Sequence, residues 1–347
     1  MRTLIYALHS GQLFGTERMA LATVAGLRDQ YRPVLLAPAG PLHAVAASQN
    51  IESRVTHSLS QQAREYRSLL RGQGQAWLMT TGVSQSLLAA ALAPLAKCRL
   101  AHIHMVHGGT DERLSYGRKR LLGALSIKLV AVSQFVRERL LAHGCKDDRI
   151  AVIENFSTEP ISQASHRPQP DRVLRVAVVS RIDPIKRVDL LLSAISRESA
   201  LQTLQFDIYG SGGELERLRD AARTMPNVRF MGFVPDAAQR LADYDLLLHT
   251  CPEEPFGLAI LEAMARRVPV LIPNSGGAGS LVTDERDGFH FAANCPGRLA
   301  QRLLEVAALP SAKREQVAEA GFAQLCSRFS AQRGLSAYRD LLEEMTP

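Results

Sequence analysis

One stretch of sixteen residues, Thr250–Ala265, constrains the fold of this chain most strongly. It reads TCPEEPFGLAILEAMA, and short apolar segments precede it at 244–249 and follow it at 268–272. Apolar runs bounded by turn residues are typical of buried strands, and the apolar spacing from Gly257 onward predicts a helix between them. A strand, a loop, a helix and a second strand form one unit of a parallel sheet, so the stretch predicts an α/β fold.

Two glutamates of this unit are predicted at positions where their side chains can contact a ligand. Glu254 lies on the loop that leaves the first strand, and Glu262 is predicted about two turns into the helix. Open α/β sheets bind ligands at the carboxyl ends of their strands. The turn at 255–257 lets the backbone approach a ligand and leaves N–H groups free at the helix start. One carboxylate can therefore contact a ligand beside the loop, and the other can contact it further along.

This stretch resembles the Glu-x7-Glu signature of retaining glycosyltransferases with the GT-B fold, in particular those of glycosyltransferase family 4. The similarity runs from Glu254 to Ala265 and continues through the Val-Pro-Val segment at 268–270. The resemblance implies two Rossmann-like domains with parallel sheets that face a cleft. It further implies that Glu254 contacts the donor sugar and that Glu262 accepts hydrogen bonds from the ribose. Further donor contacts are implied for Phe256, Gly257 and Leu258.

The rest of the chain alternates between strand and helix patterns in the same way, as a doubly wound parallel sheet requires. Its 347 residues suggest two domains of ordinary size. A segment rich in Ser, Pro and Gln, without periodicity, predicts a linker at 156–171. With the resemblance, we predict an acceptor-side domain over 1–155, a nucleotide-sugar-binding domain over 172–329, and a final helix over 330–347 that packs back towards the first domain.

Two cations, Arg181 and Lys186, flank the loop after the predicted strand at 173–179. Arginine binds phosphate with its fork, and lysine supplies a point charge. A lysine at a helix N-terminus is unfavourable without an anion, which favours an anionic ligand here. In the resembling family an Arg and a Lys, each beside a glycine, hold the donor diphosphate. Ser180 and Arg187 replace those glycines, and the resemblance implies that Arg181 and Lys186 neutralise the leaving diphosphate.

Further loops of the C-terminal half resemble the donor site of the same family. Gly210 and Gly212 follow a predicted strand and open a helix, as in the loop that shapes the nucleotide pocket. We expect the base near the backbone of Val234. Residues 274–280 predict a further run of free N–H groups suited to phosphate.

In the N-terminal half, Gly15 and Thr16 begin a Gly-Thr-Glu-Arg segment that resembles a donor-contacting loop of the family, with Phe14 where a glycine is common. An ordinary tight turn is the alternative for this loop. His107 stands at the carboxyl end of a predicted strand, before two glycines, and the resemblance implies that it faces the donor sugar. A structural role is its alternative.

The net charge and the cysteine content of the chain restrict the kinds of ligand and site that the sequence favours. The formal net charge is +7 and the pI is near 9.4, which favours anionic ligands or an anionic membrane face. No nucleic-acid motif occurs, so we expect no nucleic-acid partner. The five cysteines form no Cys-x-x-Cys pair, which predicts neither a disulfide framework nor a zinc site. The basic segment at 111–128 predicts an ordinary surface helix, with a peripheral contact to anionic lipid as the alternative.

We therefore predict a retaining hexosyltransferase that moves a sugar from a UDP- or GDP-sugar to a glycan or lipid-linked acceptor. Surface polysaccharide or glycolipid synthesis in bacteria is the implied setting, in the cytoplasm or at the inner face of the membrane. No metal or cofactor is expected. The predicted catalytic residues are Glu254, His107, Arg181 and Lys186. The alternatives are a sugar-nucleotide epimerase of the same fold and a non-catalytic two-lobed sugar-binding protein; a dehydrogenase is disfavoured because the dinucleotide fingerprint is missing.

Overall fold

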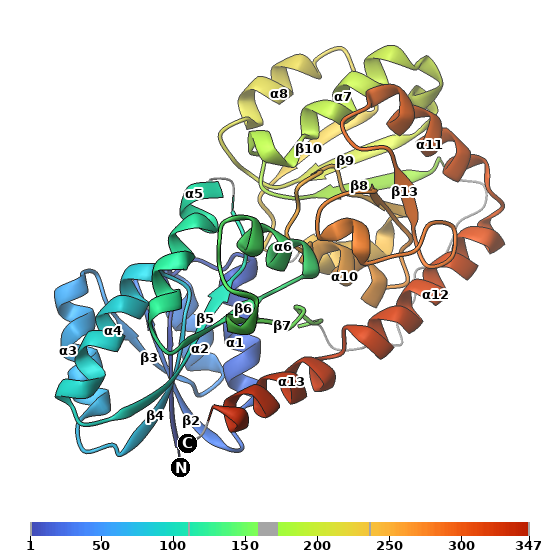
Figure 1. The fold of residues 1–347 in the computed structure, drawn as a ribbon. Helices are drawn as coiled ribbons and strands as arrows, with labels where there is room; N and C mark the ends of the chain where they lie inside the picture. Colours follow the sequence, from blue (N-terminus) through green and yellow to red (C-terminus); the bar gives the residue numbers. More distant parts are fainter. Residues whose placement is uncertain (1, 110–111, 159–172, 236, 346–347) are drawn as a thin grey trace. The chain divides into compact units, whose positions relative to one another are not determined.

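A computed structural model describes residues 2–109, 112–158, 173–235 and 237–345 (Figure 1). The chain divides into two compact units. Unit 1 combines residues 1–158 with 331–347, and unit 2 holds residues 159–330. Most of the predicted linker, 159–171, lies outside the described residues.

Unit 1 is built on a seven-stranded parallel sheet with the order β3-β2-β1-β4-β5-β6-β7. Its strands are β1 (Arg2–Ala7), β2 (Tyr31–Ala37), β3 (Glu52–Val55), β4 (Gln75–Thr80), β5 (Arg99–Val106), β6 (Ile127–Ala131) and β7 (Ile150–Val152). Its helices are α1 (Gly15–Gly26), α2 (Leu42–Ser48), α3 (Leu59–Leu70), α4 (Val83–Leu95), α5 (Glu112–Ser115), α6 (Gln134–Ala142) and α13 (Ala331–Glu344), with 3₁₀ helices η1 (Gly117–Ala124) and η2 (Asp147–Arg149). The central strands are apolar and buried on both faces, as a parallel sheet between helices requires.

The helices of unit 1 cover both faces of this sheet. Leu78 of β4 packs with α3 and α4 in one core cluster. Its neighbour Trp77 points to the opposite face, because side chains alternate along a strand, and its Nε1 donates to the carbonyl of Leu342 in α13 at 3.3 Å. Gly334 of α13 also lies so close to Phe156 that an added Cβ would be 2.1 Å from the ring. The last helix is thus an integral part of unit 1.

Unit 2 contains a six-stranded parallel sheet with the order β10-β9-β8-β11-β12-β13. The strands are β8 (Arg175–Val179), β9 (Gln205–Tyr209), β10 (Val228–Gly232), β11 (Leu246–Leu248), β12 (Val270–Pro273) and β13 (Phe289–Phe291). The helices are α7 (Val188–Arg197), α8 (Leu215–Ala221), α9 (Ala237–Arg240), α10 (Leu258–Ala265), α11 (Pro296–Ala308) and α12 (Ser311–Arg328), with 3₁₀ helices η3 (Pro184–Lys186), η4 (Ser199–Thr203), η5 (Leu241–Asp243) and η6 (Ala278–Ser280). The strand order reverses between β8 and β11, which makes that boundary a topological switch point.

The two parallel sheets confirm the predicted α/β class. The prediction of one basic helix over 111–128 is wrong where the structure describes it, because α5 ends at Ser115 and η1 is a 3₁₀ helix. Two adjacent leucines of this segment also differ in exposure, because Leu122 is buried whereas Leu121 is exposed. Within the described ranges, no helix combines the length and the apolar character that a membrane span needs.

Candidate active site

The centre of the candidate site is an ion pair at the switch point of unit 2. Lys186 follows β8, Glu254 follows β11, and the Lys186 Nζ lies 2.5 Å from a Glu254 carboxylate oxygen. Both side chains are largely buried. Ligands of open α/β sheets bind at such a boundary, so the pair stands where the fold favours a ligand.

The loop after β8 places Lys186 by local restraints. It ends in η3, where Pro184 fixes one φ angle, and the next residue, Arg187, adopts a left-handed conformation with φ +52°. The Thr250 hydroxyl donates to the Lys186 carbonyl at 2.6 Å, so the loop after β11 holds the loop after β8. The lysine is thereby fixed by both loops that border the switch point.

The Glu254 loop folds tightly between its neighbours. Gly257 has φ +101° and ends the turn before α10, a conformation that other residues rarely adopt. Gly276, with φ +67°, approaches the carbonyl of Glu254 so closely that an added Cβ would lie 3.0 Å from it. The N–H groups of Gly277 and Ala278 donate to this same carbonyl, at 2.8 and 3.2 Å.

This packing corrects one prediction. The run at 274–280 was predicted to offer free N–H groups to phosphate, but the N–H groups of residues 277–280 all donate to carbonyls of the protein. The prediction is therefore wrong for residues 277–280, whose N–H groups are used within the protein and help to hold the Glu254 loop.

Electrostatics keep Glu254 ionised. Burial alone would raise the pKa of its carboxyl, but the Lys186 charge and the neighbouring His249 outweigh burial and hold the pKa well below its usual range. Burial likewise works to lower the pKa of Lys186, and Glu254 reverses this and raises it. The lysine therefore finds in Glu254 the anion that its position near a helix start requires.

His249 is a member of this cluster that sequence reasoning missed. It follows β11 directly, is only 5% exposed, and its Nε2 lies 3.3 Å from a Glu254 carboxylate oxygen. The signal for it was present, since it ends the predicted strand that precedes Glu254. Its position lets it orient the carboxylate.

His249, Cys251 and Glu254 could also offer ligand atoms to a metal ion, since these atoms lie within 4.8 Å of one another. One observation disfavours that assignment. Lys186 already places a positive charge on the carboxylate. The cluster fits a buried ion pair better than a metal centre.

The glycine loop after β9 packs against the loop after β8 without room for side chains. A Cβ on Gly210 would lie 1.8 Å from the Ser180 carbonyl oxygen, and one on Gly212 would lie 2.4 Å from that of Ile182. The Gly210 N–H donates to the Gly232 carbonyl at 2.8 Å, which joins the end of β10 and brings nearby Val234 to the same edge. The predicted residues after β8, β9, β10 and β11 thus meet at one sheet edge.

The side chains of the other predicted residues of unit 2 differ in their exposure to solvent. Arg181 is 53% exposed, and its guanidinium contacts the Asp183 carboxylate at 2.9 Å. Phe256 is buried, with its ring edge-to-face on Phe329 at 5.8 Å, so its side chain anchors the loop in the core. Glu262 is buried in α10, a little more than one turn from its start rather than two.

Unit 1 carries the remaining predicted residues. His107 directly follows β5, and burial lowers the pKa of its imidazole to about 4, with a further contribution from His9. Gly15 and Thr16 form the first turn of α1, where the Glu17 carboxylate accepts from the Phe14 N–H at 3.2 Å. Both the loop and the histidine lie at carboxyl ends of strands.

Sequence reasoning missed two titratable residues of unit 1, His9 and Lys119. His9 follows β1, and its Nδ1 lies 2.7 Å from the Thr81 hydroxyl after β4. Lys119 is buried in η1, where its Nζ donates to the Leu114 carbonyl and burial lowers its pKa to about 8. His9 was detectable as the residue that ends the first predicted strand, but Lys119 was not, because its segment reads as a surface helix.

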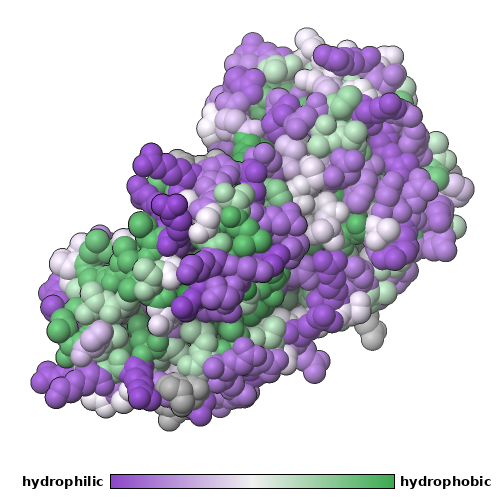
Figure 2. Space-filling model, in the orientation of Figure 1, coloured by the Kyte–Doolittle hydropathy of each residue, from purple (hydrophilic) through white to green (hydrophobic). Residues whose placement is uncertain are grey.

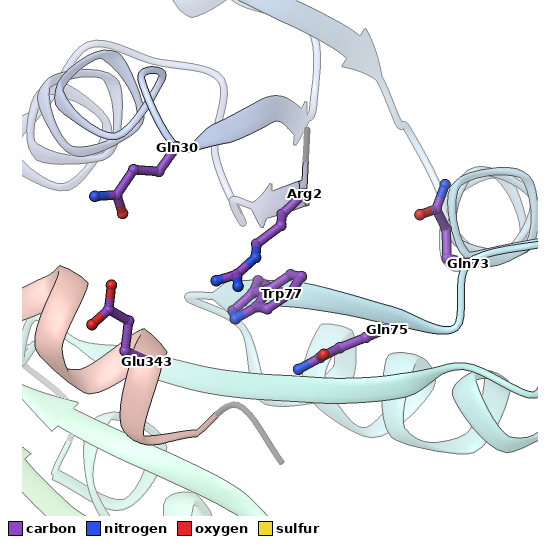
Figure 3. A pocket seen from close by; sticks show the side chains of 6 residues that line it. All are labelled: Arg2, Gln30, Gln73, Gln75, Trp77 and Glu343. Atoms are coloured by element: carbon purple, nitrogen blue, oxygen red, sulfur yellow. The ribbon is translucent and has the colours of Figure 1, made fainter.

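A separate open cavity of about 660 Å³ lies at the amino ends of β1 and β4 (Figure 3). It is lined by Arg2, Gln30, Gln73, Gln75, Trp77 and Glu343. The Arg2 guanidinium lies over the Trp77 ring, 5.2 Å from its centroid. The cavity is at the opposite edge of the sheet from His9 and His107, and it contains none of the predicted site residues.

Comparisons with known proteins bear on the family and the fold of this chain. Residues 161–324 match the family described as glycosyl transferases group 1, and residues 15–156 match Glycosyltransferase Family 4. Among solved structures, that of Anabaena Alr3699/HepE with UDP-glucose has a TM-score of 0.84 at 20% identity, covering 99% of this chain and 100% of the other. A glycosyltransferase from Rickettsia africae has a TM-score of 0.83 at 19% identity, covering 99% and 98%.

Curated relatives include the UDP-N-acetylglucosamine–peptide N-acetylglucosaminyltransferase GtfA subunit of Streptococcus gordonii, 25% identical over 62% of this chain and 44% of the relative. A GDP-mannose-dependent alpha-mannosyltransferase of Mycobacterium tuberculosis is 28% identical over 51% and 47%. The chain thus matches less than half of the length of these relatives. From the two family matches and the fold together, the chain belongs to the group 1 glycosyltransferases with the GT-B fold.

Proposed function

We propose that this protein is a hexosyltransferase that moves a sugar from a nucleoside diphosphate sugar to a glycan or lipid-linked acceptor, with retention of the anomeric configuration. The observation that carries the proposal is the buried Lys186–Glu254 pair at the switch point of unit 2, with the exposed Arg181 on the same loop as Lys186. In the reaction the anomeric carbon exchanges its phosphate oxygen for an acceptor hydroxyl oxygen. The proton of that hydroxyl leaves with the diphosphate or with solvent.

Lys186 and Arg181 would stabilise the negative charge that grows on the leaving diphosphate, and preformed charges of this kind lower the barrier most effectively. Glu254, held ionised by Lys186, would accept hydrogen bonds from the donor sugar. Glu262 would bind the ribose hydroxyls, and the glycines at 210 and 212 would admit the nucleotide to the sheet edge. His107, with its pKa lowered to about 4, would act as a neutral hydrogen-bonding group near pH 7.

The donor is proposed to be a UDP- or GDP-sugar, used without a metal ion or cofactor. The names of similar proteins support this range, since they include a UDP-N-acetylglucosamine-dependent and a GDP-mannose-dependent transferase. A role in bacterial surface polysaccharide or glycolipid synthesis follows from the same resemblance. We place the protein in the cytoplasm, with a peripheral contact to the inner face of the membrane.

The test is a product assay with a panel of UDP- and GDP-sugars and candidate glycan and lipid-linked acceptors. We expect release of free nucleoside diphosphate that depends on the acceptor, and a new glycosidic linkage whose NMR coupling shows the donor's anomeric configuration. The Lys186→Ala substitution should abolish this transfer of the sugar to the acceptor. A sugar nucleotide converted to its epimer without an acceptor would instead assign the epimerase alternative, and an inverted linkage would overturn the proposed stereochemistry.

A further inference from the structure

Helix α4 exposes an apolar face that no described residue of unit 1 covers. Its inner side, which includes Ala89 and Leu92, packs in the core against the sheet. Its outer side carries apolar residues at helical spacing, all of them exposed: Leu87, Ala91, Pro94 and Leu95. Leu95 is 77% exposed. A surface helix normally turns polar residues outward, so a helix that is apolar on both sides indicates a missing partner.

The apolar surface continues onto the neighbouring segment. Helix α4 contacts η1, where Leu121 is 58% exposed, and Leu114 of α5 is also exposed. Figure 2 shows apolar side chains gathered over α4 and the adjoining part of unit 1. We call the exposed leucines 87, 95, 114 and 121 the α4 patch. Contiguous apolar patches of this kind mark interaction sites on soluble proteins.

Positive charge surrounds the α4 patch. Residues 66–137 contain ten Lys and Arg residues but only two acidic residues, at 111 and 112, so this segment alone carries a formal charge of +8. The whole chain carries +7, so the remainder is slightly negative. Lys97, Arg118 and Arg120 are exposed, and no ion pair recorded among the described residues involves them. The net positive charge of this chain therefore lies in the sequence segment that contains the α4 patch.

We propose that the α4 patch and its cations dock unit 1 on a bilayer surface rich in anionic phospholipid. Leucines would enter the boundary between headgroups and acyl chains, while the arginines and Lys97 would pair with lipid phosphates. A second copy of this chain fits less well, because two such faces would bring their cations together. An apolar stripe is likewise unsuited to nucleic acid. The purpose of this docking rests on the proposed function, in which the acceptor is lipid-linked.

The test is co-sedimentation of the full chain with vesicles of phosphatidylcholine alone or with about one third phosphatidylglycerol, at low and high salt. We expect binding to the anionic vesicles only, and weaker binding at high salt because exposed charges are screened. Leu95→Ser/Leu121→Ser and, separately, Arg118→Gln/Arg120→Gln should each weaken binding by about tenfold or more.

Matched controls separate this surface from general effects. Val152→Ser/Val173→Ser removes two exposed apolar residues elsewhere, and Arg219→Gln/Arg223→Gln removes two exposed cations in and just after α8. Both should bind vesicles as the wild type does. Thermal shifts with UDP and GDP report on the site of unit 2 independently, so failure of the docking proposal leaves the donor proposal testable.

Two results would overturn the inference. The first is that the wild type does not bind anionic vesicles at low salt, or that the patch variants and the control variants lose vesicle binding to the same extent. The second is a dimer, measured by light scattering without vesicles, that dissociates in Leu95→Ser/Leu121→Ser while vesicle binding is absent. That outcome would assign the α4 patch to self-association.

Discussion

At the scale of single residues, the Lys186–Glu254 pair is costly to keep without a function. Taking two charges out of water carries a penalty that their attraction often does not fully offset, and apolar replacements of buried pairs are frequently neutral or stabilising. The pair is largely buried and lies next to His249 rather than in an apolar core. We therefore attribute the pair at the switch point to a ligand that uses both charges.

We predict that Lys186→Met destabilises unit 2 by about 3 kcal/mol, because it leaves the Glu254 carboxylate buried without its cation. The double variant Lys186→Met/Glu254→Gln should recover most of this loss, since no charge then remains unpaired. Hydrogen exchange of the β8 and β11 amides measures the change locally. Transfer activity should stay absent in both variants. A double variant less stable than Lys186→Met would show that the pair acts mainly as a structural element.

At the scale of elements, the glycine loop after β9 offers a sharp test of packing. Gly210→Ala should destabilise unit 2 and abolish nucleotide binding, because its Cβ would overlap the Ser180 carbonyl and because Gly210 has φ +137°. Gly213→Ala is the control in the same loop, since nothing lies within 4 Å of an added Cβ there. Thermal unfolding with and without UDP or GDP measures the stability and the nucleotide binding of both variants. Equal effects of the two substitutions would contradict the close approach of these loops.

Strand β5 carries two buried histidines that should make unit 1 sensitive to acid. The Thr80 hydroxyl lies 3.3 Å from His102 Nε2 and 3.1 Å from His104 Nδ1. Burial lowers the pKa of His102 to about 3, against an unfolded value near 6.5. Below pH 6.5 the unfolded chain binds a proton that the folded chain does not, so stability is complete above that pH and is lost as the pH falls towards 3.

We therefore predict that unit 1 loses about 2 kcal/mol more between pH 7 and pH 5 in the wild type than in His102→Gln, from this one histidine. Trp77, the single tryptophan of the chain, lies in unit 1 and reports its unfolding by fluorescence. Parallel pH dependence in the two proteins would contradict the buried, uncharged state of His102.

Much of the fold followed from local sequence patterns. The sequence predicted a strand that ends directly before His107, and β5 does end at Val106, since the His-Gly-Gly turn at 107–109 interrupts the strand pattern. The η1 segment could not be predicted, since Lys119 is buried by a hydrogen bond to a carbonyl, which no periodicity records. Helices such as α12 were not predicted either. Its sequence is largely polar, and its burial depends on contacts with α10.

Some features of the candidate site could likewise be predicted from the sequence, and others could not. Arg181, Lys186 and Glu254 stood out because their residue types follow buried strands. The pairing of Lys186 with Glu254 joins residues 68 apart, so only the sheet order reveals it. The 274–280 run was misinterpreted for a related reason, because its N–H groups look free until the Glu254 loop is placed against them.

At the scale of the whole molecule, the chain returns to unit 1 at its end. Tyr338 and Leu342 of α13 are buried in unit 1. We predict that Tyr338→Ala destabilises unit 1 by about 3 kcal/mol, as loss of a large buried ring does, while Tyr338→Phe costs much less, because its hydroxyl has only a weak contact, 3.8 Å to the sulfur of Met105. Trp77 fluorescence measures both variants. A change confined to unit 2 would contradict the placement of α13.

In the proposed reaction the Arg181–Lys186 loop of unit 2 binds a nucleoside diphosphate. The most direct measurement is a thermal-shift panel with UDP, GDP, ADP, dTDP and NAD on the wild type and Arg181→Ala. Arg181 is suited to this comparison because its exposed side chain should leave the fold intact when removed. We expect UDP or GDP to stabilise the wild type by about 2.7 kcal/mol at a hundredfold excess over its dissociation constant, and the variant much less. No shift with any diphosphate, or a shift with NAD alone, would contradict the claim.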